Sequence, residues 1–230
     1  MELIWQGLKE AIRLLSRGDD VMYSTTARSL YVSGAATLFS LVVGVAAGAF
    51  LAYQRFPGRG LLMTLVNTGM GLPPVAVGLV VAIILWRSGP LGELKLIYTP
   101  WAMMIAQAVL AAPIVTGFTA AALAAQRPEL RLQLFGIGAS RLQALWIVLK
   151  EARLPIVAAV MAAFGAAVSE VGASMMVGGN IAGETRVLTT AVVLETSRGE
   201  FGPAIALSLI LLALVFFVNL VLTSVQLREG

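Results

Sequence analysis

The side chains that most often perform chemistry are scarce in this 230-residue sequence. It contains no cysteine and no histidine, and its only aspartates are Asp19 and Asp20. Thiolate nucleophiles, disulfides and imidazole-based acid–base or metal sites are therefore excluded. None of the three lysines follows a glycine, as the lysine of a phosphate-binding loop would, so this chain is not expected to hydrolyse nucleotides. The sequence predicts neither an enzyme nor a metal centre.

One carboxylate remains as a candidate for function. Glu170, in the run Ser-Glu-Val-Gly-Ala at 169–173, is the only charged residue deep within a long apolar segment. Burying a carboxylate in a bilayer is costly, so such a residue is a candidate functional site. The alternative is a structural carboxylate that is protonated or bonded to backbone amides, and the sequence leaves both interpretations open.

Composition identifies the surroundings of that carboxylate. Apolar residues make up 59% of the chain and charged residues 12%, and the mean hydropathy is +0.90. These values predict an all-α membrane protein that forms a single domain over residues 1–230. Residues 1–20 are expected to hold an interfacial amphipathic helix, and residues 183–195 a helix too polar to cross. Five spans are expected, at about 30–53, 61–86, 100–125, 154–177 and 203–225.

Two of these spans carry unusual residues. Ser40, Gly44, Gly48 and Ala52 form a stripe of small side chains in the first span, which predicts close packing against another helix. The second span contains Leu-Pro-Pro at 72–74, which should kink or break the helix. In a bilayer such a break survives only beside protein or a water-filled cavity. It could therefore line a conduit or serve as a packing kink.

The most polar long segment, residues 127–153, lies between the third and fourth spans. Its apolar residues repeat with helical spacing on both sides of Gly136 and Gly138, and Ser140 with Gln143 fits a capping box. The pattern predicts two short helices at an angle, which suit docking to another protein. An ordinary amphipathic loop is the alternative.

Gly138-Ala-Ser140, followed by Pro155, resembles the cytoplasmic coupling loop of bacterial ABC-importer permeases. The match is partial, because the Glu-Ala-Ala of that family falls on Leu-Gln-Leu at 132–134. The resemblance implies a loop that inserts into an ATPase subunit. The residues it assigns to ATPase coupling are Arg131, Phe135, Gly138, Ala139, Ser140, Leu142 and Leu145.

Six short stretches between residues 55 and 195, among them Asn-Thr-Gly-Met-Gly-Leu-Pro-Pro and Ser-Glu-Val-Gly-Ala, look like the permease subunit of tungstate ABC importers. This resemblance implies a type I ABC-importer permease fold and a homodimer in a bacterial or archaeal cytoplasmic membrane. It also implies ATPase subunits that bind ATP and Mg, and an extracytoplasmic oxyanion-binding protein. The chain itself should bind no cofactor. One departure is Ala166, where such permeases usually carry an arginine one helical turn before the glutamate.

The function implied is passage of an oxyanion, tungstate first, by alternating access. The residues expected to line the conduit or its gate are Asn67, Leu72, Pro73, Pro74, Ser169, Glu170, Gly172 and Asn180. The expected spans contain no lysine or arginine, so anion binding in the conduit should be weak. Import of molybdate, sulfate or another small solute stays open, as does a channel or scaffold outside this family.

Overall fold

The computed structural model describes Trp5, Gly7, Lys9, residues 11–13 and residues 20–229. Within these residues the regular elements are all helical, which confirms the expected all-α class. The helices are α2 (Asp20–Tyr53), α3 (Arg59–Gly69), α4 (Pro74–Leu85), η1 (Gly92–Leu94), α5 (Pro100–Ala124), α6 (Pro128–Gly136), α7 (Arg141–Glu151), α8 (Arg153–Val168), α9 (Gly172–Gly178), α10 (Leu188–Ser197) and α11 (Phe201–Glu229).

Three of these helices, α2, α5 and α11, are long and apolar enough to cross a membrane. Two pairs qualify only together, because each is bent sharply at a short break. The pair α3 and α4 is bent by 105°, and the pair α8 and α9 by 58°. If each bent pair is counted as one span there are five spans, in agreement with the sequence.

The helix bounds correct the sequence-based expectations in three places. The helix α2 begins at Asp20, about ten residues earlier than expected, so Arg28 is helical. The fourth span is not the single helix that was expected, because the chain leaves the helix at residues 169–171. The short polar helix begins at Leu188 rather than Gly183, whose φ of 79° places it in a turn instead.

Small side chains bring α2 and α5 into close contact. A Cβ atom on Gly44 would lie 2.6 Å from Val115 Cβ, and one on Gly48 would lie 2.7 Å from Thr119 Cβ. Between these helices the Ser40 hydroxyl donates to the Ala108 carbonyl at 3.1 Å. The predicted stripe therefore packs within the subunit, as small residues on membrane helices commonly do.

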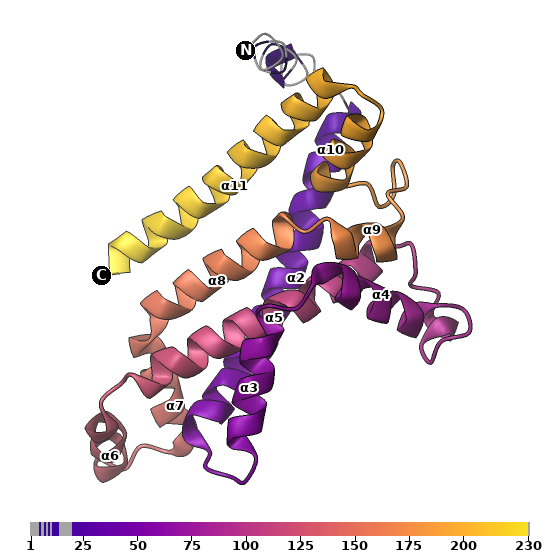
Figure 1. Cartoon of the computed structure of the whole chain (residues 1–230). Coiled ribbons are helices and arrows are strands. Elements are labelled where there is room, and N and C mark those ends of the chain that lie inside the picture. Colours follow the sequence, from indigo (N-terminus) through magenta and orange to yellow (C-terminus); the bar gives the residue numbers. More distant parts are fainter. Residues whose placement is uncertain (1–4, 6, 8, 10, 14–19, 230) are drawn as a thin grey trace.

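The helices are arranged around α2 and α5 (Figure 1). The α6–α7 hairpin lies at one end of the molecule and α10 at the other, near the described N-terminal residues. The helix α11 lies at the periphery, and large apolar side chains such as Phe216 and Phe217 are exposed along it. Of the expected N-terminal amphipathic helix, Trp5, Gly7, Lys9 and residues 11–13 are helical, and the rest falls outside the described residues.

Candidate functional site

The break between α3 and α4 follows directly from its sequence. Pro73 and Pro74 lack the N–H groups that would continue the helix, and the Gly71 amide instead closes a turn on the Thr68 carbonyl at 3.0 Å. Pro74 then occupies the first turn of α4, where its fixed φ suits a helix start. Residues 70–76 are exposed on the surface of the single chain. The break is therefore largely exposed on the single chain where α4 begins.

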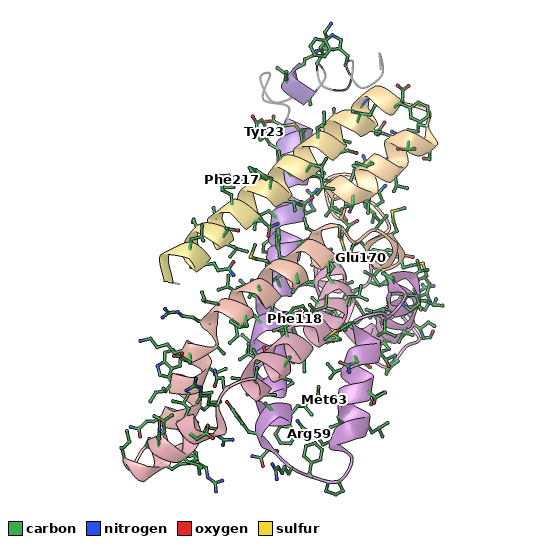
Figure 2. All side chains as sticks on the ribbon, turned by 60° about the vertical axis from the view of Figure 1, so that its left-hand side comes forward. Tyr23, Arg59, Met63, Phe118, Glu170 and Phe217 are labelled. Atoms are coloured by element: carbon green, nitrogen blue, oxygen red, sulfur yellow. The ribbon has the colours of Figure 1, made fainter. Side chains whose placement is uncertain are left out.

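The break between α8 and α9 is built around Glu170 (Figure 2), which is 8% exposed. Its carboxylate Oε1 accepts a hydrogen bond from the Ala173 amide at 2.7 Å, in the first turn of α9. Its backbone carbonyl accepts a hydrogen bond from the Thr189 hydroxyl at 3.1 Å, which ties α10 to the break. A carboxylate at the first turn of a helix satisfies an N–H group that has no partner within the helix. This contact matches the structural interpretation of Glu170, in which the carboxylate is bonded to a backbone amide.

The two breaks lie against each other, because α4 packs on α9. A Cβ atom on Gly78 would lie 2.6 Å from the Ala173 Cα, and one on Gly172 would lie 2.6 Å from Val75 Cγ2. Glycine at both positions lets the start of α4 approach the start of α9 closely. The fold therefore brings Leu72, Pro73 and Pro74 near Ser169, Glu170 and Gly172.

The two asparagines of the expected conduit lie elsewhere. Asn67 is exposed on α3, one turn before the first break. Asn180 lies past the far end of α9, where its side-chain amide donates to the Thr190 carbonyl at 3.4 Å. Its side-chain oxygen accepts a hydrogen bond from Arg186 Nε at 3.3 Å. The described hydrogen bonds of Asn180 therefore order the loop before α10.

Some polar contacts near the breaks were missed by sequence reasoning. Gln107 on α5 donates to the Ser174 hydroxyl at 3.2 Å, and both side chains are buried. At the end opposite the α6–α7 hairpin, Arg28 donates to the carbonyls of Gly183 and Arg186 at 2.6 and 2.9 Å. Only the early start of α2 brings Arg28 to this loop, and nothing in the local sequence signals it.

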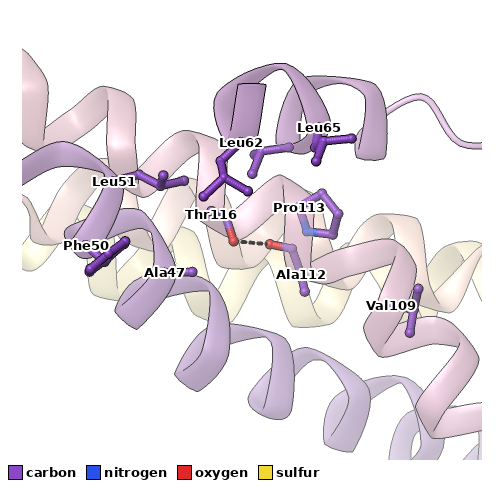
Figure 3. Close-up of a pocket in the computed structure, with 10 residues that line it drawn as sticks. Ala47, Phe50, Leu51, Leu62, Leu65, Val109, Ala112, Pro113 and Thr116 are labelled. Atoms are coloured by element: carbon purple, nitrogen blue, oxygen red, sulfur yellow. Dashed lines mark hydrogen bonds between the residues drawn. The ribbon is translucent and has the colours of Figure 1, made fainter. Parts of the chain in front are cut away.

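The groove between α2, α3 and α5 is the more apolar of two described grooves (Figure 3). It has a volume of about 450 Å³ and is lined almost entirely by aliphatic side chains. The hydroxyl of Thr116 faces it but donates to the Ala112 carbonyl at 2.8 Å. Such a groove cannot stabilise a dianion, because its lining offers no charge and no free donor. It is not a candidate for the transported solute.

The expected coupling loop forms a helical hairpin of α6 and α7. Gly138 has a φ of 86°, which glycine adopts without strain, and it turns the chain between the helices. The predicted capping box is present. The backbone N–H of Gln143 donates to Ser140 Oγ, and the backbone N–H of Ser140 donates to Gln143 Oε1. The sequence thus predicted both the turn and the start of α7.

The hairpin is tied to the spans by one face and exposes the other. Val148 is buried with Leu134 against α5, and its carbonyl accepts a hydrogen bond from the Gln126 side chain at 2.9 Å. The Arg131 guanidinium stacks over the Tyr53 ring with 3.8 Å to the ring centre. Away from the buried cluster the hairpin carries large apolar side chains that are 70–81% exposed: Leu132, Ile137, Leu142 and Trp146.

The seven residues assigned to coupling divide between these faces. Phe135, Leu142, Gly138 and Ser140 are exposed, so they are available to a partner. Ala139 and Leu145 are partly buried against the Leu134–Val148 cluster and support the hairpin from beneath. Arg131 is also partly buried, at its contact with Tyr53.

Residues 40–228 match the family described as binding-protein-dependent transport system inner membrane component. Over 98% of its length the chain is 39% identical to the tungstate uptake system permease protein of Peptoclostridium acidaminophilum, of which it covers 99%. It is 42% identical to a probable anion ABC transporter permease protein of Haloferax volcanii, over 86% of this chain and 88% of that one.

A solved structure has the same fold. It is the MetNI methionine ABC transporter in inward-facing conformations, which superposes with a TM-score of 0.73 and 19% identity. The match covers 92% of this chain and 97% of the chain compared. At that identity the likeness concerns the fold, and it confirms the type I ABC-importer permease architecture.

Proposed function

This chain belongs to the family of binding-protein-dependent transport system inner membrane components, and we propose that the solute it passes is an oxyanion, tungstate first. It is a multi-pass permease subunit of an ABC importer and not itself an enzyme. The observation that carries the tungstate assignment is the 39% identity with a tungstate uptake permease along nearly the whole of both chains. Molybdate and sulfate are the competing substrates.

The chain functions as one transmembrane domain over residues 1–230, in the cytoplasmic membrane of a bacterium or archaeon. An extracytoplasmic oxyanion-binding protein delivers the solute, and ATPase subunits that bind ATP and Mg drive the cycle. The α6–α7 hairpin, within the loop at 127–153, docks into an ATPase subunit on the cytoplasmic side. Its exposed apolar face supports this role, because apolar side chains surrounded by charged ones mark protein contact sites.

Two copies of the chain form the conduit between them. The exposed break at Leu72–Pro74 and the neighbouring residues Ser169–Gly172 line or flank it, since in membranes irregular backbone is tolerated beside protein or water. Asn67 lies on α3 about one helical turn before that break, and we include it in the lining, whereas Asn180 acts through the loop before α10. Glu170 fixes the start of α9 and so sets the shape of this passage.

The conduit offers no tight anion site. In the described contacts of both breaks, no lysine or arginine approaches Glu170, and a carboxylate would repel a dianion if ionised. Weak binding suits a pathway, since a tightly held ion would not leave. Selectivity therefore belongs to the external binding protein.

The experiment is uptake of labelled tungstate into vesicles that contain the permease, its ATPase and its binding protein. We expect competition by unlabelled tungstate to exceed that by molybdate or sulfate. Uptake inhibited equally by all three anions would refute the tungstate assignment. Without the binding protein, the permease–ATPase complex should bind tungstate more weakly than about micromolar, or roughly −8 kcal/mol. Tighter binding would place a selective site in the spans.

The coupling assignment is tested by Gly138→Val with Gly136→Val as its matched control. Valine at the φ of 86° costs about 1–2 kcal/mol and should distort the hairpin, whereas Gly136 has no such φ and open space for a side chain. We expect Gly138→Val to reach the membrane but to lose ATP-driven uptake. Normal uptake with normal stimulation of the ATPase would contradict docking through this hairpin.

A further inference from the structure

The second groove runs along the end of α2 that approaches the α6–α7 hairpin. It has a volume of about 960 Å³. One wall is the apolar surface of α2 from Leu41 to Phe50, and the other is formed by α6, α7 and the start of α8. The hairpin end carries the polar groups Tyr53, Gln54, Arg131 and Arg141. The groove is thus apolar along its length and cationic at one end.

Its position matches one leaflet of a bilayer. The thirteen residues from Leu41 to Tyr53 span twelve helical rises, or about 18 Å, and half of a hydrocarbon core is about 15 Å thick. If α2 crosses the bilayer with Tyr53 at its boundary, the apolar wall lies at the depth of the acyl chains. The two arginines then lie at the level of the headgroups, on the side of the hairpin.

The charge at the mouth of the groove is not neutralised within the described part of the chain. No described carboxylate forms an ion pair with Arg131 or Arg141, and none lines the groove. Arg131 is held in place by the Tyr53 ring, with its guanidinium 3.8 Å from the ring centre and 5.9 Å from that of Phe135. A guanidinium fixed on an aromatic face still presents its N–H groups to an oxyanion of phosphate geometry.

We propose that this groove binds an anionic phospholipid, with an acyl chain along α2 and the phosphate between Arg131 and Arg141. Basic pockets between membrane helices on the cytoplasmic side bind anionic headgroups in this manner. A protein that docks from the cytoplasm could reach Arg141 but not the wall formed by Leu41 and Val45 at bilayer depth. The lipid would contact both α2 and the coupling hairpin, and so would hold the hairpin against the membrane.

This inference rests on the cytoplasmic orientation of the hairpin in the proposed function, but not on the transported anion. The test is retention of deuterated phosphatidylglycerol by the purified permease–ATPase complex, counted by native mass spectrometry. Vesicles of phosphatidylglycerol and phosphatidylcholine supply both lipids before extraction. We expect one tightly held phosphatidylglycerol per permease chain and no comparable phosphatidylcholine. Retention requires no transport, so its failure is distinguishable from failure of the tungstate assignment.

Two sets of variants test the headgroup contacts and the acyl-chain contacts of the lipid separately. Each of Arg131→Gln and Arg141→Gln should weaken retention about fivefold, and the double variant about 30-fold, since each basic group near the surface contributes comparably. Lys150→Gln is the charge control, because Lys150 is exposed on α7 outside the groove. Ala46→Phe should block the groove without a change in charge, whereas Ala213→Phe on the exposed face of α11 should not.

Three results would overturn the proposal. Equal retention by wild type and the double arginine variant would exclude a headgroup site at these residues. Equal retention of phosphatidylcholine would exclude recognition of the anionic headgroup. Disulfide cross-linking of Val42→Cys between two copies in the assembled complex, together with absence of bound lipid, would assign the groove to the second copy.

Discussion

The α6–α7 hairpin and the contact between α4 and α9 are stabilised by different means. The hairpin is defined by residues close in sequence, through the capping box of Ser140 and Gln143 and the turn at Gly138. The α4–α9 contact joins residues about 95 apart, and its fit depends on Gly78 and Gly172 having no side chain. The hairpin exposes Leu132, Ile137, Leu142 and Trp146, whereas α4 and α9 bury Val77, Val81, Ala173 and Val177 in one cluster. Substitutions in the hairpin should therefore alter association with a partner protein. Substitutions at the α4–α9 contact should alter the stability of the fold.

The largest effect on stability is expected from Gly78→Ala. The added Cβ would lie 2.6 Å from the Ala173 Cα and 3.1 Å from Met176 Cβ, so α4 and α9 must separate. Overpacking of this kind costs about 1–3 kcal/mol. We expect a lower Tm of the purified complex and reduced uptake, measured by a thermal-shift assay and by vesicle transport.

The matched control for this substitution is Gly165→Ala on α8. An added Cβ there meets no atom within 4 Å, so the change should be neutral or slightly stabilising through helix propensity. If both variants had the same Tm, close packing would not be what holds the two breaks together.

The next largest effect on stability is expected at Glu170. Two substitutions there separate the role of its charge from that of its hydrogen bond. Its Oε1 accepts a hydrogen bond from the Ala173 backbone N–H at 2.7 Å, and a glutamine side-chain oxygen can accept the same hydrogen bond. Glu170→Ala should lower stability by about 1 kcal/mol, the usual cost of losing a side-chain cap. Glu170→Gln should keep both stability and uptake near those of the wild type.

The outcome that would contradict this assignment is specific. If Glu170→Gln stayed as stable as the wild type but lost uptake, the negative charge itself would act in the gate. The two substitutions thus decide between the structural and the functional interpretation of this carboxylate, a choice that the sequence left open.

The sequence predicted the hairpin better than the break around Glu170, for a physical reason. Capping boxes, proline breaks and positive-φ glycines depend on neighbours within a few residues, so Ser140, Pro73 and Gly138 were all identified correctly. The break between α8 and α9 has no proline, and apart from Ser169 and Glu170 its stretch is as apolar as a continuous span. It is stabilised by contacts from α4 and α10, which are distant in sequence.

The same limitation applies to individual site residues. Asn180 was predicted to line the conduit or its gate, and its bonds to Arg186 and Thr190 place it in the loop before α10. The first span was expected to begin near Leu30, so Arg28 lay outside it. Its partners Gly183 and Arg186 lie more than 150 residues away, so a local pattern could not reveal them.

The smallest effect on stability is expected from Trp146→Ala in the hairpin. Trp146 is 70% exposed and does not line either groove, so its loss should change the free energy of unfolding by about 0.5 kcal/mol or less. Association with the ATPase should nevertheless weaken, because an exposed aromatic anchor at an interface can contribute about 2 kcal/mol or more.

The matched control is Trp101→Ala. Trp101 is 59% exposed in the first turn of α5, at the end away from the hairpin. Both variants should keep the wild-type Tm. When the ATPase is titrated in before purification, only Trp146→Ala should retain less of that subunit. Equal ATPase recovery from both would mean that the exposed face of α7 does not contact the ATPase. The partner would then have to engage Leu132 and Ile137 on the α6 side, where the same titration with Ile137→Ala would detect it.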